Sequence, residues 1–179
     1  FTTHTLGMTV RSSREVSQVC AGTSTNCSGG SIQGTQEARF TTQVTLPAGC
    51  DSYTISYTEC DRNNAITNLT NGGSFSLYVE TRLNTNLAPC NSSPQFSNLP
   101  VLYSCQNQLA QFNHGFFDPD GDSLVFNLTN PRTTNNVNMN FVSGLSATNP
   151  LLLQTGTTFQ FDPTNGQMTF SPEANRIQV

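Results

Sequence analysis

The sequence predicts an all-β fold, because apolar residues alternate with polar ones in nearly every periodic segment. Such alternation is typical of half-buried strands in antiparallel sheets. The segments are rich in β-branched and aromatic residues, which strands favour, and no long segment has the 3.6-residue period of a helix. The alternating apolar sets are Phe40/Val44/Leu46, Tyr53/Ile55/Tyr57, Phe75/Leu77/Val79/Leu83, Leu124/Phe126/Leu128, Phe159/Phe161 and Met168/Phe170.

Turn-forming residues separate these segments at a spacing typical of β-sandwiches. A stretch rich in proline and small polar residues, 88–100, divides the segments into two sets. We therefore predict two immunoglobulin-like antiparallel β-sandwich modules in tandem, residues 1–90 and 91–179. The final residues, RIQV, resemble the start of a strand, so we expect the last strand of the second module to be incomplete.

Six cysteines predict that disulfides stabilise these modules. A module of about 90 residues buries only roughly 60–65% of the surface that its unfolded chain exposes, so it needs crosslinks. The even count, the absence of a CxxC motif and the presence of only two histidines argue against zinc. Disulfides also indicate a compartment outside the reducing cytosol. The six are Cys20, Cys27, Cys50, Cys60, Cys90 and Cys105.

The sequence leaves the disulfide connectivity open. Cys20 and Cys27 flank the short polar loop AGTSTN and can close a small ring. Cys50 and Cys60 lie at opposite ends of one predicted strand, so a bond between them requires that strand to bend. The alternatives are Cys50 with Cys90 and Cys60 with Cys105.

Charge and hydropathy exclude several partners. The formal net charge is −4 and all seven basic residues are dispersed arginines, so no basic cluster is present to bind nucleic acid or anionic lipid. No apolar run reaches the roughly 18 residues that a membrane span needs, so we expect no membrane insertion. The chain begins with Phe rather than Met. Together with the predicted disulfides, this leads us to expect part of a longer exported protein, located outside the cell at its surface.

The segment FFDPDGDSLVFNL has two interpretations. Residues 118–121, Asp-Pro-Asp-Gly, fit a type I turn, which is the favoured interpretation. The alternative is a calcium site, since carboxylates at alternating positions are hard oxygen ligands. Calcium is thus the one cofactor that the sequence suggests, although the positions of glycine and Thr129 exclude an EF-hand. The candidate ligands are Asp118, Asp120 and Asp122, with Asp162 or Glu80 as remote ligands.

Two further local predictions concern a turn and a strand face. The segment DPTNGQ, 162–167, is expected to join two strands as a hairpin, with Asn165-Gly166 in a type I′ turn. In SFSLYVETRL, 74–83, the predicted core-facing side holds Phe75, Leu77 and Val79. Tyr78 lies on the opposite side and is expected to be a surface aromatic.

We predict no catalytic residues. His4 lies near a chain end and His114 lies between aromatics, and neither is accompanied by a GxSxG motif for Ser-His-Asp catalysis. Cysteine catalysis needs a free thiol, which the disulfide prediction opposes. A glycosidase needs paired carboxylates across a cleft. The chain has no tryptophan and only four tyrosines to serve as sugar platforms.

Candidate recognition elements are the loops 61–73 and 130–140, because binding residues often lie on loops of a rigid scaffold. Arg62 is expected to brace its loop through Asp61 or backbone carbonyls, with partner binding as the alternative. The strand-like ends at Phe1 and Val179 offer edges to which a neighbouring chain can add a strand.

Four sequence blocks, in this order and spacing, resemble very large surface proteins of Bacteroidota. Those proteins are often exported by the type IX secretion system, and many are described as gliding-motility-associated or as containing PKD or other immunoglobulin-like domains. The resemblance covers about residues 15–172. The blocks are TISYTECDRNNAITNL, SLYVETRLN, CNSSPQFSNLPVLYSCQNQ and FNHGFFDPDGDSLVFNLTNP.

This resemblance implies serial β-sandwich modules on long extracellular stalks, with roles in adhesion or surface architecture and no shared catalytic mechanism. The partners it implies are neighbouring modules of the same protein or copies of the chain in a fibre, with surface glycans as a further class. It also implies that Ser123, in Asp122-Ser123-Leu124, matches a short O-glycosylation pattern of this phylum, although the start of a strand is the favoured interpretation.

We therefore expect a non-enzymatic structural or adhesin module of a cell-surface protein. The alternatives are a glycan- or protein-binding recognition module and a self-assembling filament subunit joined by strand addition.

Overall fold

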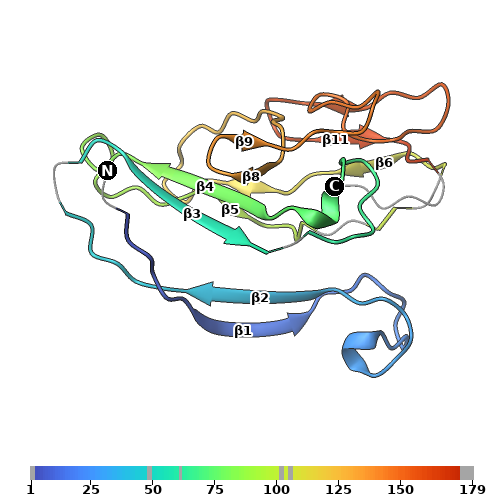
Figure 1. Ribbon diagram of the computed structural model, residues 1–179, viewed down its shortest axis with the longest axis horizontal. Helices are drawn as coiled ribbons and strands as arrows, with labels where there is room; N and C mark the ends of the chain where they lie inside the picture. Colours follow the sequence, from blue (N-terminus) through green and yellow to red (C-terminus); the bar gives the residue numbers. More distant parts are fainter. Residues whose placement is uncertain (1–2, 48–49, 61, 101–102, 105–106, 174–179) are drawn as a thin grey trace. The chain divides into compact units, whose positions relative to one another are not determined.

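The computed structural model describes residues 3–47, 50–60, 62–100, 103–104 and 107–173. The chain forms two compact units, Phe1–Pro47 and Ala48–Val179 (Figure 1). The regular structure is almost entirely antiparallel β, with two short 3-10 helices, so the prediction of an all-β fold is confirmed. Within the described part of the chain, no helix is both long enough and apolar enough to cross a bilayer.

The first unit is a two-stranded antiparallel sheet of β1 (Thr9–Glu15) and β2 (Gln36–Thr41). The register shifts between Val10 and Ser12, which marks a bulge. Arg14 and Glu37 face each other across the sheet and form an ion pair of 2.5 Å. This contact lowers the pKa of Glu37.

Thr25 holds together the loop that joins these two strands. The hydroxyl of Thr25 accepts the Cys27 N–H at 3.2 Å, and the Ser28 hydroxyl accepts the Thr25 N–H at 3.2 Å. This capping box begins the 3-10 helix η1 (Asn26–Ser28). Thr25 is fully buried, and its hydroxyl also donates to the carboxylate of Glu15 at the end of β1.

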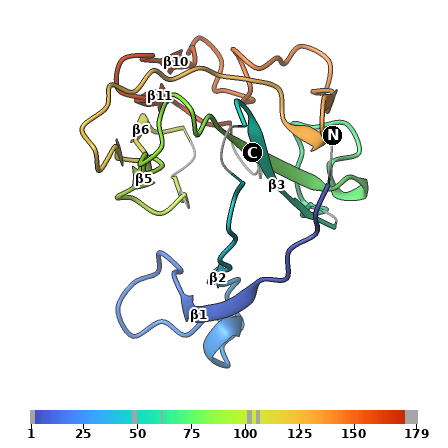
Figure 2. The same cartoon turned by 90° about the vertical axis from the view of Figure 1, so that its left-hand side faces the viewer.

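The described residues of the second unit form three sheets, and Figure 2 shows β10, β11 and β6 lying together. Their strand orders are β3-β4-β8-β9, β10-β11-β6 and β5-β7. The elements are β3 (Tyr53–Glu59), η2 (Gly72–Ser74), β4 (Leu77–Leu83), β5 (Gln95–Phe96), β6 (Ala110–Phe112), β7 (Phe116–Phe117), β8 (Arg132–Thr134), β9 (Val137–Asn138), β10 (Gln160–Phe161) and β11 (Met168–Phe170).

The division between units differs from the boundary predicted near residue 91. It falls after Pro47, and β4 pairs with β8 through Tyr78 and Arg132, so one sheet spans residue 91. A boundary rich in proline and small polar residues therefore marks a long connection inside the second unit. Local composition identifies a segment with little regular structure, in which only the two-residue strand β5 forms, whereas strand pairing alone decides which strands share a sheet.

The predicted orientation of β4 is wrong. Tyr78 is only 8% exposed, whereas Leu77 and Val79 on the other side are 38% and 50% exposed. Alternation shows that β4 has two faces but does not show which one is covered. Here Glu80 and Arg132 cover the Tyr78 side through a hydrogen bond and a cation–π contact.

Two predicted strands are shorter or absent. The strand expected from Phe40 to Leu46 ends at Thr41. Residues 124–128 keep alternating burial but form no strand, and the N–H of Phe126 donates instead to the Pro163 carbonyl at 3.2 Å. Apolar alternation thus matches the burial of 124–128 but not that of 40–46, where Phe40 and Val44 are exposed, and a strand also needs a neighbour with which to bond.

The hairpin between β10 and β11 is confirmed, but its predicted turn type is wrong. Type I′ requires positive φ at two residues, and only Gly166 has it, at 74°. The Gly166 N–H donates to the Asp162 carbonyl at 2.8 Å, which makes a longer loop. The Asp162 carboxylate accepts the Thr164 N–H at 2.8 Å and stabilises this alternative.

Candidate functional site

The two segments predicted as recognition loops lie against each other in the second unit, but the prediction of a loop at 130–140 is wrong, because this segment forms strands β8 and β9 and the turn between them. Thr70 donates its N–H to the Asn140 carbonyl at 2.9 Å, and Val142 donates to the Asn68 carbonyl at 3.1 Å. Leu69 and Phe141 form an antiparallel bridge between these bonds. We call residues 62–73 and 131–142 the loop pair.

The interior of the loop pair is closed to solvent. Asn68 is 0% exposed, and Leu69 and Met139 are 3% and 4% exposed. The Asn68 side chain donates from Nδ2 to the Pro150 carbonyl at 2.9 Å. These side chains therefore stabilise the unit and are not available to a ligand.

Arg62 braces the loop pair as predicted, through a backbone carbonyl. Its Nη2 donates to the Arg132 carbonyl at 2.9 Å, and its backbone N–H donates to the Phe75 carbonyl at 3.1 Å. Its Nε is buried and has no hydrogen-bond partner among the described residues, and burial lowers the pKa of the guanidinium. Asp61, the other predicted partner, lies outside the described residues.

A charged cluster joins β4 to β8 beside the loop pair. Glu80 accepts the Tyr78 hydroxyl at 2.7 Å and forms an ion pair of 3.1 Å with Arg132. Arg132 also lies with Cζ 5.1 Å from the centre of the Tyr78 ring. The Tyr78 hydroxyl and Arg132 lower the pKa of Glu80, so its negative charge is held by these partners rather than presented to a ligand.

Sequence reasoning did not identify this cluster, although a signal was present. Tyr78, Glu80 and Arg82 are spaced by two residues, so they share one face of a strand. Arg82 is also paired with Glu80, at 3.3 Å. A strand face that carries an aromatic, an acidic and a basic residue in succession is compatible with a solvent-exposed surface. It is equally compatible with a network of ion pairs inside the unit.

The aspartate segment forms a hydrogen-bonded turn, which supports the favoured interpretation. The Gly121 N–H donates to the Asp118 carbonyl at 3.1 Å, which closes residues 118–121. The Asp118 carboxylate accepts the Asp120 N–H at 2.8 Å and the Asp122 N–H at 3.4 Å. The Asp120 carboxylate accepts the Ser92 N–H at 2.5 Å.

The predicted calcium ligands are not brought together. In the part of the chain that the structure describes, no three His, Cys, Asp or Glu side chains are grouped so that they could share a metal ion. The two remote candidates have other partners, since Asp162 caps its own turn and Glu80 is ion-paired. The turn therefore accounts for this segment without a metal.

Replacing Asp118 with alanine is expected to lower the free energy of unfolding by about 1 kcal/mol, because two backbone N–H groups lose their acceptor. Urea denaturation with calcium and with EDTA measures this loss, and we expect the same value in both. Asp122→Ala is the matched control, with an expected change within about 0.5 kcal/mol. A calcium-dependent midpoint that both substitutions abolish would contradict the turn and restore the calcium site.

The structure shows no disulfide between the described cysteines, so the predicted crosslinks stay a prediction. Cys20, Cys27, Cys60 and Cys90 are exposed, and Cys50 is half-buried. Cys20 and Cys27 do lie in the same β1–β2 loop, which Thr25 holds. Cys105 lies outside the described residues, as do Phe1 and Val179 at the predicted edges for strand addition.

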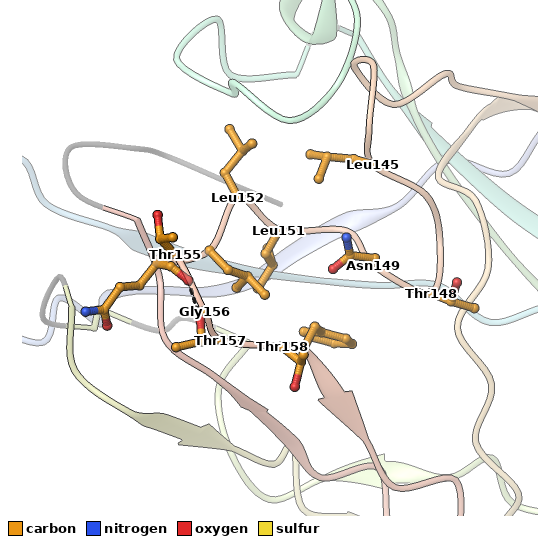
Figure 3. A pocket seen from close by; sticks show the side chains of 12 residues that line it. Leu145, Thr148, Asn149, Leu151, Leu152, Thr155, Gly156, Thr157 and Thr158 are labelled. Carbon is orange, nitrogen blue, oxygen red and sulfur yellow. Dashed lines mark hydrogen bonds between the residues drawn. The ribbon is translucent and has the colours of Figure 1, made fainter.

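A hollow of about 510 Å³ lies along residues 145–159 (Figure 3). Leucines and threonines provide most of its lining, with Asn149 and Phe159. The Thr157 hydroxyl already donates to the Gln154 carbonyl at 2.8 Å. None of the residues that line the hollow has a titratable side chain, so its walls offer no general acid or base.

His114, which lies between aromatic residues in the sequence, also lies in an aromatic cluster in the structure. Its ring is 4.7 Å from Phe112, 5.5 Å from Phe116 and 5.8 Å from Phe96. The Nδ1 atom is buried, with no partner among the described residues. Burial lowers the pKa of His114, so the neutral imidazole is favoured in the folded state.

Acid is therefore expected to destabilise the second unit through His114. Above the ordinary pKa of 6.5 the ring is neutral in both folded and unfolded chains, and its contribution is complete. As the pH falls below 6.5, His114 binds a proton more readily in the unfolded chain than in the folded chain. The free energy of unfolding therefore decreases until the pH has fallen below the lowered pKa of the folded state. Melting temperatures at pH 7.5 and 5.5 measure this, and His114→Leu should remove part of the difference. The exposed His4→Gln variant should keep all of it, and an equal change in both variants would refute the assignment.

Comparison of the chain with protein-family models, curated proteins and solved structures finds no match. The fold places the chain in the class of antiparallel β proteins. Its residues 62–73 and 131–142 are joined by backbone hydrogen bonds.

Proposed function

We propose that this chain is a non-enzymatic structural or adhesin part of a large extracellular surface protein, like those of Bacteroidota that its sequence resembles. The observation that carries this proposal is the closed loop pair. The loops best placed for recognition use their backbone groups on each other and bury Asn68, Leu69 and Met139. Such loops contribute stiffness rather than a binding surface.

Exposed apolar residues support the proposal that the chain packs against neighbouring modules or copies. Among the described residues only four large hydrophobic side chains are buried, whereas eighteen are exposed. Scattered exposed apolar residues are ordinary, but grouped ones mark surfaces that another protein covers. Neighbouring modules of the same protein, or copies of the chain in a fibre, are the partners that this proposal requires.

Site chemistry supports the absence of catalysis in this proposal. The hollow at 145–159 has no titratable lining, His114 is surrounded by phenylalanines, and Glu80 is held by two arginines and a tyrosine. Asp118 is occupied by backbone N–H groups. His114, Glu80 and Asp118 thus each have a structural role.

The proposal includes immunoglobulin-like sandwich modules and disulfides that resist force in an oxidising exterior. Single-molecule stretching tests this mechanical role. The reduced chain can extend to at most roughly 600 Å, at about 3.3–3.6 Å per residue. The oxidised chain should extend less, because each disulfide locks the residues that it encloses. Equal extension of oxidised and reduced chains would refute the crosslinked module.

A recognition module remains the second candidate, and the tips of the loop pair favour it. Exposed amides and a hydroxyl, which suit glycan binding, come from Asn63 and Asn64, from Thr134 at the end of β8, and from the turn residues Asn135 and Asn136. A glycan array probed with the chain and with Asn135→Ala tests this function. Binding that the substitution removes would favour recognition, and binding by neither protein would favour the structural role.

A further inference from the structure

Strand β3 forms an open edge of the four-stranded sheet. It lies at the end of the order β3-β4-β8-β9, and within the described residues it pairs only with β4. The ladder with β4 covers all seven residues, from Tyr53 to Glu59, with no register shift. At residues 54–59 the outer side of β3 therefore presents a regular row of backbone N–H and C=O groups.

β3 lacks the features that normally protect an edge strand. It has no proline, no lysine and no bulge. The opposite edge is protected, because β9 has only two residues and the β8–β9 ladder has an irregular register. Strand addition is therefore favoured at β3 and not at β9.

One face of this edge is apolar and exposed. Residues directly opposite in a ladder share a face, so Ile55 and Tyr57 of β3 lie on the side of Val79 and Leu77 of β4. Ile55 is 44% exposed, Val79 is 50% exposed and Leu77 is 38% exposed. A strand added beside β3 would extend this apolar face.

The sequence of β3 is complementary to itself in antiparallel pairing. It reads YTISYTE, and Ser56 is its centre. A twofold axis at Ser56 places Thr54 opposite Thr58 and Ile55 opposite Tyr57 of the second copy. Threonine pairs and aromatic–β-branched pairs are among those that stabilise neighbouring strands.

Charge also favours an antiparallel second copy. Glu59 is the only charged residue of β3, and it lies at the end of the strand. Twofold pairing separates the two Glu59 side chains by the full length of the strand, whereas parallel in-register pairing would place them side by side. Like charges directly opposite each other are destabilising.

We propose that β3 is a self-association site, at which two copies of the chain join their sheets by antiparallel β3–β3 pairing centred on Ser56. The site rests on the geometry of β3 and does not depend on the proposed function. Its failure would leave the structural role of the chain untouched.

Two double variants at the same exposed positions test the register. T54E/T58K places opposite charges across both Thr54–Thr58 contacts of the dimer, and T54K/T58K places like charges there. Sedimentation velocity over a concentration series gives the dissociation constant, with non-reducing gels to exclude intermolecular disulfides. We expect the parent chain to dimerise reversibly, and T54K/T58K to dissociate at least about tenfold more readily than T54E/T58K.

A parent chain that is monomeric over the whole series would overturn the proposal, and so would equal dissociation constants for the two variants. Circular dichroism checks that both variants fold. A second measurement needs no variant: hydrogen exchange of the parent should slow at amides in residues 54–58 as concentration rises. Exchange that is independent of concentration would also refute the pairing.

Discussion

Replacing Asn68 with alanine is expected to lower the free energy of unfolding of the second unit by about 2–3 kcal/mol. The Asn68 side chain is fully buried and donates to the Pro150 carbonyl at 2.9 Å, 82 residues away in sequence. Alanine removes this donor and leaves the Pro150 carbonyl without its partner, beside a cavity where the Asn68 amide had been. Equilibrium urea denaturation measures the loss.

Two further substitutions distinguish the effect of the buried Asn68 hydrogen bond from a general effect of replacing an asparagine. Asn140→Ala changes an exposed residue of the same loop pair and should shift stability by no more than about 0.5 kcal/mol. Asn68→Asp keeps the shape but replaces the donor with a carboxylate facing a carbonyl, so it should be at least as harmful as alanine. If Asn68→Ala and Asn140→Ala unfold at the same urea concentration, the hydrogen bond from Asn68 to Pro150 does not contribute to the free energy of unfolding.

Replacing Gly30 with alanine is expected to cost on the order of 3 kcal/mol and to unfold the sheet of the first unit. A Cβ atom at Gly30 would lie 2.0 Å from the Ser24 carbonyl oxygen and 2.4 Å from its carbon, which are backbone atoms. The Gly30 N–H also donates to the Thr25 carbonyl at 2.6 Å, so the loop cannot move aside without breaking that bond. A two-stranded sheet has little stability with which to offset this cost.

Hydrogen exchange at β1 and β2 provides the measurement, because their ladder amides should lose protection in Gly30→Ala. Gly7→Ala is the matched control in the same unit, since a Cβ there meets nothing within 4 Å. Indistinguishable exchange in the two variants would show that the close approach of Gly30 to Ser24 is not present in solution.

Several predictions succeeded because their causes are local. The turn at 118–121 depends on the carboxylate of Asp118 and on Gly121, which has a positive φ of 82°. The strand 53–59 depends on alternation and β-propensity within seven residues, and β3 matches it. The brace formed by Arg62 was also expected, although the sequence did not reveal that its acceptor is 70 residues away.

Most of the failures concern long-range contacts, whereas the failed type I′ turn has a local cause. Tyr78 is covered because β8 brings Arg132 over its ring, and nothing near Tyr78 in the sequence indicates that. The type I′ turn was displaced by an Asp162 cap that competes with it over the same few residues. In the sequence, nothing distinguishes Asn68 from other loop asparagines. Its role becomes visible only in the structure, where it contacts Pro150 and Val142.

The sequence by itself determined that this protein is built from antiparallel strands joined by hydrogen-bonded turns, because alternation and turn chemistry act between residues close in the chain. Only the tertiary structure decided which face of β4 is covered, that loops 62–73 and 131–142 bond to each other, and that β3 is left as an edge. Those outcomes depend on which distant segments meet, and pairing between distant segments is set by the packing of the whole unit rather than by any local pattern.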